Sequence, residues 1–252
     1  MRRIDDKGVF RCSKRQCGHR ELSMKKHTFF YGGCLSCRDV LRLAHLWLSG
    51  ITHTSAKILT GHSSASVSTY YGHFRQLVEQ SLVPEDQIIG GPGIVVEVDE
   101  TKLGKRKYNK GHKVDGVWVL AGIEHTEKSR IFLVPIEKRD SNTLITAILE
   151  HVSEGSILVT DSWKGYAQVN DELNFEYYTV NHSQTFKDPV TGACTNKVEG
   201  LNNGLKLKIA MRNRVKDGIN KHLAEYIWRK KHTSSLWESF IDAIKNVHYD
   251  IE

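Results

Sequence analysis

Three apolar runs of strand type follow one another in the middle of the chain, and this succession constrains the fold most. They cover residues 94–102, 116–125 and 129–138, and the short turn HTEK joins the last two. A helix is predicted next, over 141–152, followed by strands over 156–161 and 175–182 with a short helix over 163–173 between them. Two further helices are predicted over 196–209 and 219–232.

This element order is that of the ribonuclease-H-like fold. An ordinary doubly wound domain would begin βαβ, and no glycine-rich phosphate loop follows the first strand here. We therefore expect an α/β fold with a ribonuclease-H-like domain over 94–252. The segment 83–93 contains two prolines and three glycines and is predicted to be a linker.

Residues 38–82 have the pattern of three helices. The first, in DVLRLAHLWLSG, places its large apolar residues on one face, the second ends at Gly61, and the third begins within a run of serines. Three short helices with a glycine-containing turn before the last are typical of a helix-turn-helix DNA-binding domain. Ser66, Ser68 and Thr69 would then contact DNA, whereas the alternative is a plain three-helix packing unit.

Charge favours a polyanionic partner. The net charge is +7, and residues 197–231 hold ten basic and three acidic residues. Such basic clusters are typical of nucleic-acid contacts, although solvated surface is the alternative. The candidate DNA contacts outside the helix-turn-helix are Lys105, Arg106, Lys107, Lys164, Lys206, Lys208 and Arg212.

The cysteines suggest a metal site in the basic segment 1–37. No apolar run reaches about 18 residues and no secretory signal is recognisable, so we expect no membrane partner and a reducing compartment. Cys12 and Cys17 form one close pair and Cys34 and Cys37 another, which could hold Zn²⁺ tetrahedrally, with His19 as a substitute ligand. Alternatively, Cys34 and Cys37 are merely small residues that open a helix. Cys194 stands alone and is expected to be structural.

Three carboxylates stand where they could project from the sheet toward a common site. Asp99 lies near the end of the first strand, Asp161 ends the fourth, and Glu199 lies on the helix that begins near Asn196. Carboxylates from separate elements can hold two Mg²⁺ or Mn²⁺ ions about 4 Å apart, the arrangement that phosphoryl transfer requires. Asp99, on the central strand, is the candidate bridging ligand. Glu97 lies on the same face of the strand and is its competitor.

Two further side chains could serve such a site. Lys206 follows Glu199 by seven residues, which is about two full helical turns, so both side chains face the same way. His182, after the fifth strand, could contact a scissile phosphate or assist proton transfer. Each has an ordinary alternative, a solvated helix stripe for Lys206 and a histidine satisfied by backbone for His182.

Four stretches resemble a known family. They are VVEVDET (95–101), VTDSWKGY (159–166), VNHSQTF (180–186) and TNKVEGLNNGLK (195–206). In this order they resemble the Merlin-type eukaryotic DNA transposases and their bacterial insertion-sequence relatives, which are DDE-type enzymes. The resemblance implies that Asp99, Asp161 and Glu199 are the catalytic triad and that Lys206 is the family's following lysine. Family members often carry a bulky aromatic after E-G, where this chain has Leu201, Asn202 and Asn203, a departure expected to affect DNA contacts.

The resemblance also implies an activity and partners. Such an enzyme would bind the terminal inverted repeats of a transposon, cut the ends with metal-dependent hydrolysis and join the freed 3′-hydroxyl to target DNA. A homodimer or larger assembly on DNA is expected, in the nucleus of a eukaryote or with the nucleoid of a bacterium. Two alternatives remain open, a ribonuclease-H-like nuclease without strand transfer and a domesticated transposase that only binds DNA.

Overall fold

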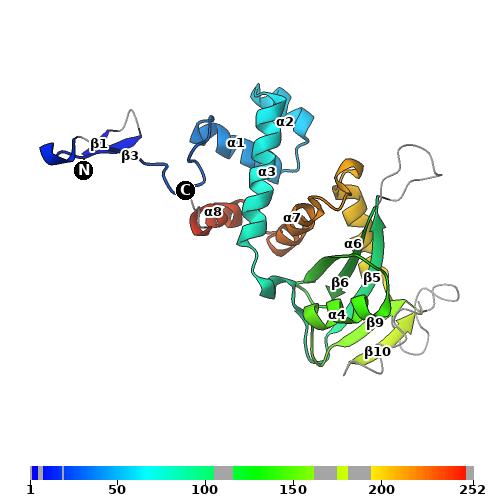
Figure 1. Cartoon of the computed structure of the whole chain (residues 1–252). Coiled ribbons are helices and arrows are strands. Elements are labelled where there is room, and N and C mark those ends of the chain that lie inside the picture. Colours follow the sequence, from blue (N-terminus) through cyan, green and yellow to red (C-terminus); the bar gives the residue numbers. More distant parts are fainter. Residues whose placement is uncertain are drawn as a thin grey trace. The chain divides into compact units, whose positions relative to one another are not determined.

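The computed structural model describes residues 2–4, 8–18, 20–104, 116–161, 175–180 and 194–247 (Figure 1). The chain divides into two compact units. One comprises Met1–Ser81 together with Ser234–Glu252, and the other comprises Leu82–Thr233. Among the described residues, no helix is both long enough and apolar enough to cross a membrane.

Four helices form the core of the first unit: α1 (Cys37–Leu48), α2 (His53–Thr60), α3 (Ser64–Ser81) and α8 (Leu236–Asn246). Trp47 on α1, Phe74 on α3 and Phe240 on α8 meet with ring centroids 5.5–5.9 Å apart. Only three residues separate α2 from α3, and Gly61 ends α2 in the left-handed conformation. This short turn is the connection expected of a helix-turn-helix.

The N-terminal segment of the first unit folds as a small antiparallel sheet, which the sequence pattern had not indicated. Its order is β1 (Arg2–Ile4), β2 (Val9–Arg11) and β3 (Glu21–Ser23). Between β2 and β3 lies the short 3-10 helix η2 (Arg15–Cys17), which Gly18 ends with φ 57°. The turn between these strands therefore carries both members of the first cysteine pair.

A five-stranded mixed sheet organises the second unit. Its strands are β5 (Val95–Leu103), β6 (Val117–Glu124), β7 (Ile131–Ile136), β9 (Ile157–Asp161) and β10 (Glu176–Val180), in the order β10-β9-β5-β6-β7. β6 is antiparallel to both of its neighbours, whereas β5, β9 and β10 are parallel. This order and these directions are those of the ribonuclease-H-like fold, so the expected α/β fold class is confirmed.

Helices cover both faces of this sheet. α4 (Ser141–His151) packs on one face, where Val96 and Val98 of β5 belong to the same buried apolar cluster as the α4 side chains. α6 (Asn196–Lys208) and α7 (Ile219–Lys231) pack on the other, with the short 3-10 helix η6 (Met211–Asn213) between them. Because strand side chains alternate between faces, Glu97 and Asp99 point to the α6 side.

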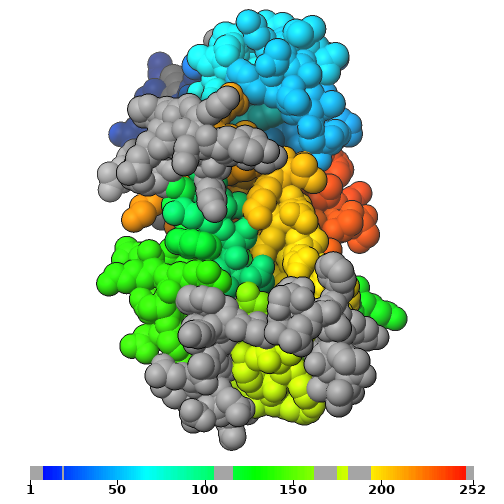
Figure 2. Space-filling model, turned by 90° about the vertical axis from the view of Figure 1, so that its right-hand side faces the viewer, coloured from blue at the N-terminus to red at the C-terminus, as the bar shows by residue number. Residues whose placement is uncertain are grey.

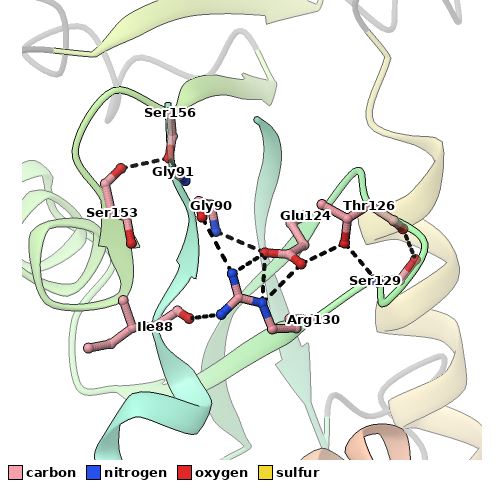
Figure 3. Close-up of polar contacts among 9 residues, drawn as sticks. All are labelled: Ile88, Gly90, Gly91, Glu124, Thr126, Ser129, Arg130, Ser153 and Ser156. Carbon is pink, nitrogen blue, oxygen red and sulfur yellow. Dashed lines mark hydrogen bonds and ion pairs between the residues drawn. The ribbon is translucent and has the colours of Figure 1, made fainter. Parts of the chain in front are cut away.

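The segment predicted to be a linker is instead tied firmly to the sheet. It contains the 3-10 helix η3 (Pro84–Gln87) and the strand β4 (Ile89–Gly90), which pairs in parallel with β8 (Val152–Ser153). The buried Glu124 carboxylate accepts a hydrogen bond from the Gly90 amide at 3.0 Å and forms an ion pair with Arg130 at 2.9 Å (Figure 3). Arg130 also donates to the Ile88 carbonyl at 3.1 Å. We call these contacts the Glu124–Arg130 clamp.

Most predicted elements of the sheet are confirmed to within about two residues. The predicted helix over 163–173 lies outside the described residues. The domain boundary differs at the C-terminus, because α8 belongs to the same compact unit as α1–α3 and not to the sheet unit. The expected domain over 94–252 is therefore interrupted after Thr233.

Candidate active site

The register of the sheet brings two of the three candidate carboxylates side by side. Glu97 of β5 stands opposite Val159 of β9 in a parallel pair. Two residues further along each strand lie Asp99 and Asp161, on the same face. Neighbouring strands are about 4.8 Å apart, and the two carboxylates are near enough that the Asp161 charge helps to raise the pKa of Asp99.

Glu97 is not available as a ligand because it already has structural partners. Its side chain is 0% exposed. One carboxylate oxygen lies 2.5 Å from His125 Nε2, and the other accepts a hydrogen bond from the Val198 amide at 2.8 Å. Val198 lies in the first turn of α6, so Glu97 anchors the start of that helix to the central strand.

Asp99 has a different environment. It is half-buried, and the Asn202 side chain donates to its Oδ2 at 2.8 Å. Burial, together with the neighbouring Glu100 and Asp161 carboxylates, raises the pKa of Asp99 to about 6. Asn202 is itself buried, and within the described residues its Oδ1 has no hydrogen-bond partner. The sequence had suggested that residues 201–203 bear on DNA contacts, but Asn202 instead contacts a candidate metal ligand.

Glu199 and Lys206 lie on α6 beside Asn202. Glu199 is exposed and accepts a hydrogen bond from Thr195 Oγ1 at 3.5 Å. It precedes Asn202 by three residues, and Lys206 follows Asn202 by four, so all three side chains are neighbours on one helical face. Nevertheless, no group of three or more His, Cys, Asp or Glu side chains in the described part of the chain is arranged to hold a metal ion. The structure therefore places Asp99 near Asp161. Glu199 lies about one helical turn from Asn202, the residue that donates a hydrogen bond to Asp99.

The paired carboxylates fit a divalent cation. Oxygen is the donor that Mg²⁺ and Mn²⁺ prefer, and a cation would relieve the repulsion between Asp99 and Asp161. The buried Asn202 Oδ1 adds a further oxygen close to Asp99 that lacks a partner among the described residues. The sequence gives no signal for this role, because an asparagine inside a helix has no characteristic spacing.

The candidate DNA contacts divide into three groups. Ser68 and Thr69 are exposed on α3, whereas the Ser66 hydroxyl lies 2.9 Å from Ser63 Oγ at the start of the helix. In the second unit, Lys208 and Arg212 are exposed, as is Lys206. The remaining candidates, among them the histidine proposed to assist catalysis, lie outside the described residues: Lys105, Arg106, Lys107, Lys164 and His182.

The cysteines come together only in part. The backbone amide of Lys14 and the Cys17 thiol lower the pKa of Cys12. Cys37 is the first residue of α1 and Cys34 is exposed just before it. In the described part of the chain the two pairs do not form one metal-binding group, and His19 lies outside it. Cys194 lies 3.8 Å from Glu97 Oε1, at the anchored start of α6.

Comparison with known proteins places this arrangement in a family. The model of the ISXO2-like transposase domain matches residues 89–246, and no curated protein matches. The Drosophila P element transposase strand transfer complex is similar at 13% identity and a TM-score of 0.33, covering 87% of this chain and 62% of that one. The pre-cleavage Mos1 transpososome is similar at 8% identity and a TM-score of 0.23, covering 88% and 82%. The chain thus spans less than two thirds of the P element transposase chain that it matches.

The family match covers more than half of the chain, over the mixed sheet and its helices. The chain therefore belongs to the ISXO2-like transposase domain family, within the DDE superfamily of transposases.

Proposed function

We propose that this transposase cuts the DNA at the ends of a transposon and joins the freed 3′-hydroxyls to target DNA in a metal-dependent reaction. One observation carries the proposal. Asp99 and Asp161 occupy matching positions on neighbouring strands, close enough that the charge of one helps to raise the pKa of the other. A half-buried pair of like charges is costly to maintain and is typical of a functional site.

Asp99 and Asp161 are the residues that would hold divalent cations, with Glu199 as the third ligand. Glu199 is one turn from Asn202, which touches Asp99, so a rotation of its side chain would bring its carboxylate toward the pair. Two Mg²⁺ or Mn²⁺ ions bound there would activate the nucleophile and stabilise charge on the phosphate.

The surrounding residues position the acids and the DNA. Glu97 fixes the first turn of α6, and therefore the place of Glu199, through the Val198 amide. Asn202 holds Asp99 in one orientation by its 2.8 Å hydrogen bond. Lys206, exposed on the same helical face, would bind a phosphate of the DNA strand beside the site. Cleavage and joining are both in-line displacements, so the same side chains serve both steps.

The helical unit would bind the terminal inverted repeats. Its α2–α3 turn has the helix-turn-helix connection, and Ser68 and Thr69 are exposed near the start of α3. Two ends must be joined to the target together, so we propose a dimer or larger assembly on DNA. The protein would act where the genome lies, in the nucleus or with the nucleoid. The first cysteine pair would take part in Zn²⁺ binding only together with further ligands.

The proposal is tested with labelled duplexes that carry the DNA ends flanking the coding sequence. With Mg²⁺ or Mn²⁺ the protein is expected to produce cut ends and, with target DNA, joined product. Asp161→Asn should lower both by about a thousandfold or more, because several kcal/mol of charge stabilisation is lost and each 1.36 kcal/mol is tenfold in rate.

Glu97→Gln is the matched control on the same strand face as Asp99. It should lower the thermal unfolding midpoint by loosening α6 and slow the reaction far less than Asp161→Asn does, because it removes an anchor of α6 and not a proposed metal ligand. Cut ends without joined product would favour a nuclease that lacks strand transfer. Full activity in Asp161→Asn would refute the assignment of the metal site.

A further inference from the structure

The end of α6 exposes large apolar side chains to an unusual degree. Leu207 is 88% exposed, more than any other large apolar side chain in the described part of the chain, and Met211 in η6 is 51% exposed. Val215 follows at 36%. We call Leu207 and Met211 the apolar end patch. Large apolar side chains exposed four residues apart at the end of one helix are a candidate interaction surface.

This patch is held in place rather than frayed. The Arg214 guanidinium donates from Nε to the Ile209 carbonyl at 2.9 Å and from Nη2 to the Lys206 carbonyl, so it closes the C-terminal end of α6. Its Nη1 also lies 3.3 Å from Met211 Sδ. Arg214 thus folds η6 back on the end of α6. The main chain of Arg214 packs closely on Gly104, the residue that follows β5, because a Cβ at Gly104 would stand 2.9 Å from the Arg214 carbonyl oxygen.

The charges around the patch select its occupant. Residues 206–216 contain five basic residues and no acidic one. A symmetric contact between two copies would set these positive segments against each other, which is unfavourable. A polyanion that also has apolar faces satisfies both properties of the surface, and nucleic acid with exposed bases is such a ligand. The outside of an intact duplex offers mainly phosphate and sugar, so the bases must be unpaired to reach a leucine.

The position of the patch relates it to the carboxylates. Leu207 is eight residues after Glu199 on α6, about 12 Å along the helix axis. That distance spans roughly three to four steps of 3.4 Å along a DNA strand. Figure 2 shows α6 in gold, with its outer face turned toward the viewer.

We propose that the apolar end patch receives unpaired bases of the DNA strand a few nucleotides from the phosphate bound at Asp99 and Asp161. This proposal rests on the proposed function, since it takes DNA as the substrate. Leu207 and Met211 supply apolar surface for the base faces, while Lys206 and Lys208 contact the phosphates on either side. The patch would therefore favour DNA ends whose terminal base pairs are open, and would help to keep them open.

The test measures binding by the full-length protein without divalent metal, so that no cleavage occurs. Two labelled DNAs of equal length and charge are compared by fluorescence anisotropy, one fully paired and one with about five mismatched pairs at its end. The wild-type protein should bind the mismatched end more tightly. Leu207→Ala combined with Met211→Ala should lower affinity for that end about tenfold and leave the paired duplex and its salt dependence unchanged.

The matched control is Leu149→Ala on α4, which removes a leucine that is 57% exposed and far from the basic segment in sequence. It should bind both DNAs as the wild type does. A double variant that keeps the wild-type preference would overturn the proposal. So would a double variant whose sedimentation coefficient falls while its DNA preference persists, because the patch would then be a contact between copies. Loss of preference in the double variant supports the proposal even if the wild type shows no cleavage, whereas cleavage with unchanged preference supports the proposed function alone.

Discussion

At the scale of single residues, two acids on one face of β5 are used in opposite ways. Glu97 is enclosed, and both of its oxygens contact groups that stabilise a carboxylate. Asp99 is half-buried beside the Glu100 and Asp161 carboxylates, and it accepts hydrogen bonds from the Asn202 side chain and the Glu100 amide. A carboxylate whose oxygens accept hydrogen bonds stabilises the local fold. A carboxylate close to other carboxylates is instead repelled by them, and a bound cation would relieve that repulsion. This difference in surroundings supports an anchoring role for Glu97 and the proposed metal binding by Asp99.

The raised pKa of Asp99 predicts how metal binding depends on pH. Folding raises this pKa from an ordinary 3.8 to about 6, so the folded protein holds the proton more tightly than the unfolded chain. In metal-free protein the resulting stability is fully present below pH 3.8 and is lost as the pH rises through 6. A cation must displace the proton, so Mn²⁺ should bind about tenfold more weakly at pH 5 than at pH 7.5.

Isothermal titration calorimetry at pH 5, 6 and 7.5 measures this change. Asp99→Asn should bind Mn²⁺ weakly at every pH and serves as the control. Equal affinity of the native protein at pH 5 and pH 7.5 would contradict the raised pKa or the role of Asp99 as a ligand.

The sequence pointed to these acids but not to the residues that position them. Asp99 and Asp161 stood out because an aspartate at the end of an apolar strand packs poorly. Asn202 gave no such signal, since its importance depends on how α6 crosses β5, which only the folded chain determines. For the same reason Glu97 could be recognised as a competitor, but not as an anchor for α6.

At the scale of elements, the Glu124–Arg130 clamp shows how the start of the second unit is fixed. Burial tends to raise the pKa of Glu124, but hydrogen bonds from Arg130, Thr126 and the Gly90 amide outweigh burial and hold the pKa below its ordinary value. The clamp joins the β6–β7 hairpin to the segment 88–91 (Figure 3). It therefore ties the segment that precedes β5 to the sheet.

Arg130→Met should destabilise the second unit. It leaves the buried Glu124 carboxylate with fewer donors, at a cost of about 2 kcal/mol, less than for a fully buried pair because Arg130 is partly exposed. The stability associated with Glu124 is present above pH 4.5 and is lost as the pH falls through its lower folded pKa, so the difference between variant and native protein should shrink in acid.

Urea unfolding at pH 7 and pH 4 measures both effects. Lys128→Met, an exposed change in the same hairpin, is the control and should be nearly neutral. An Arg130→Met protein as stable as the native one would show that the clamp contributes no net stability.

Elements of the sheet were predictable because each is an apolar run of characteristic length. The helices α1, α4 and α6 were predictable from their periodic apolar faces. The strands β1–β3 were not, since they are three residues long and largely polar. The prolines and glycines over 83–93 predicted a linker, and in the structure they allow this segment to follow a tight path against the sheet as η3 and β4. Gly90, for example, has φ 85°, and a Cβ there would stand 2.3 Å from Ser156 Oγ.

At the scale of the whole molecule, the two units are connected by two crossings of the chain. The chain leaves the helical unit after Ser81 and returns to it after Thr233. The sequence patterns did not predict α8 as a separate helix, and its residues fell within the expected sheet domain over 94–252. Its partners, Trp47 and Phe74, are more than 160 residues away in sequence, and no local pattern records such a contact.

Phe240→Ala should therefore destabilise the N-terminal helices and spare the sheet. Removing a fully buried phenylalanine costs about 3–5 kcal/mol. Hydrogen exchange should show lower protection in α1 and α3, with β5 and β6 unchanged. Asp242→Ala, an exposed position on α8, provides the control. Loss of protection in the sheet instead would contradict the division into two units.

The return of α8 to the first unit also sets an order for folding on the ribosome. The helices α1–α3 emerge before the sheet unit, but Phe240 is synthesised after it. All strands of the sheet unit therefore leave the ribosome before the helical core can close. A nascent chain would carry a complete sheet unit while the helical core is still open, so the proposed recognition of a transposon end would become available only after residue 240 has been synthesised.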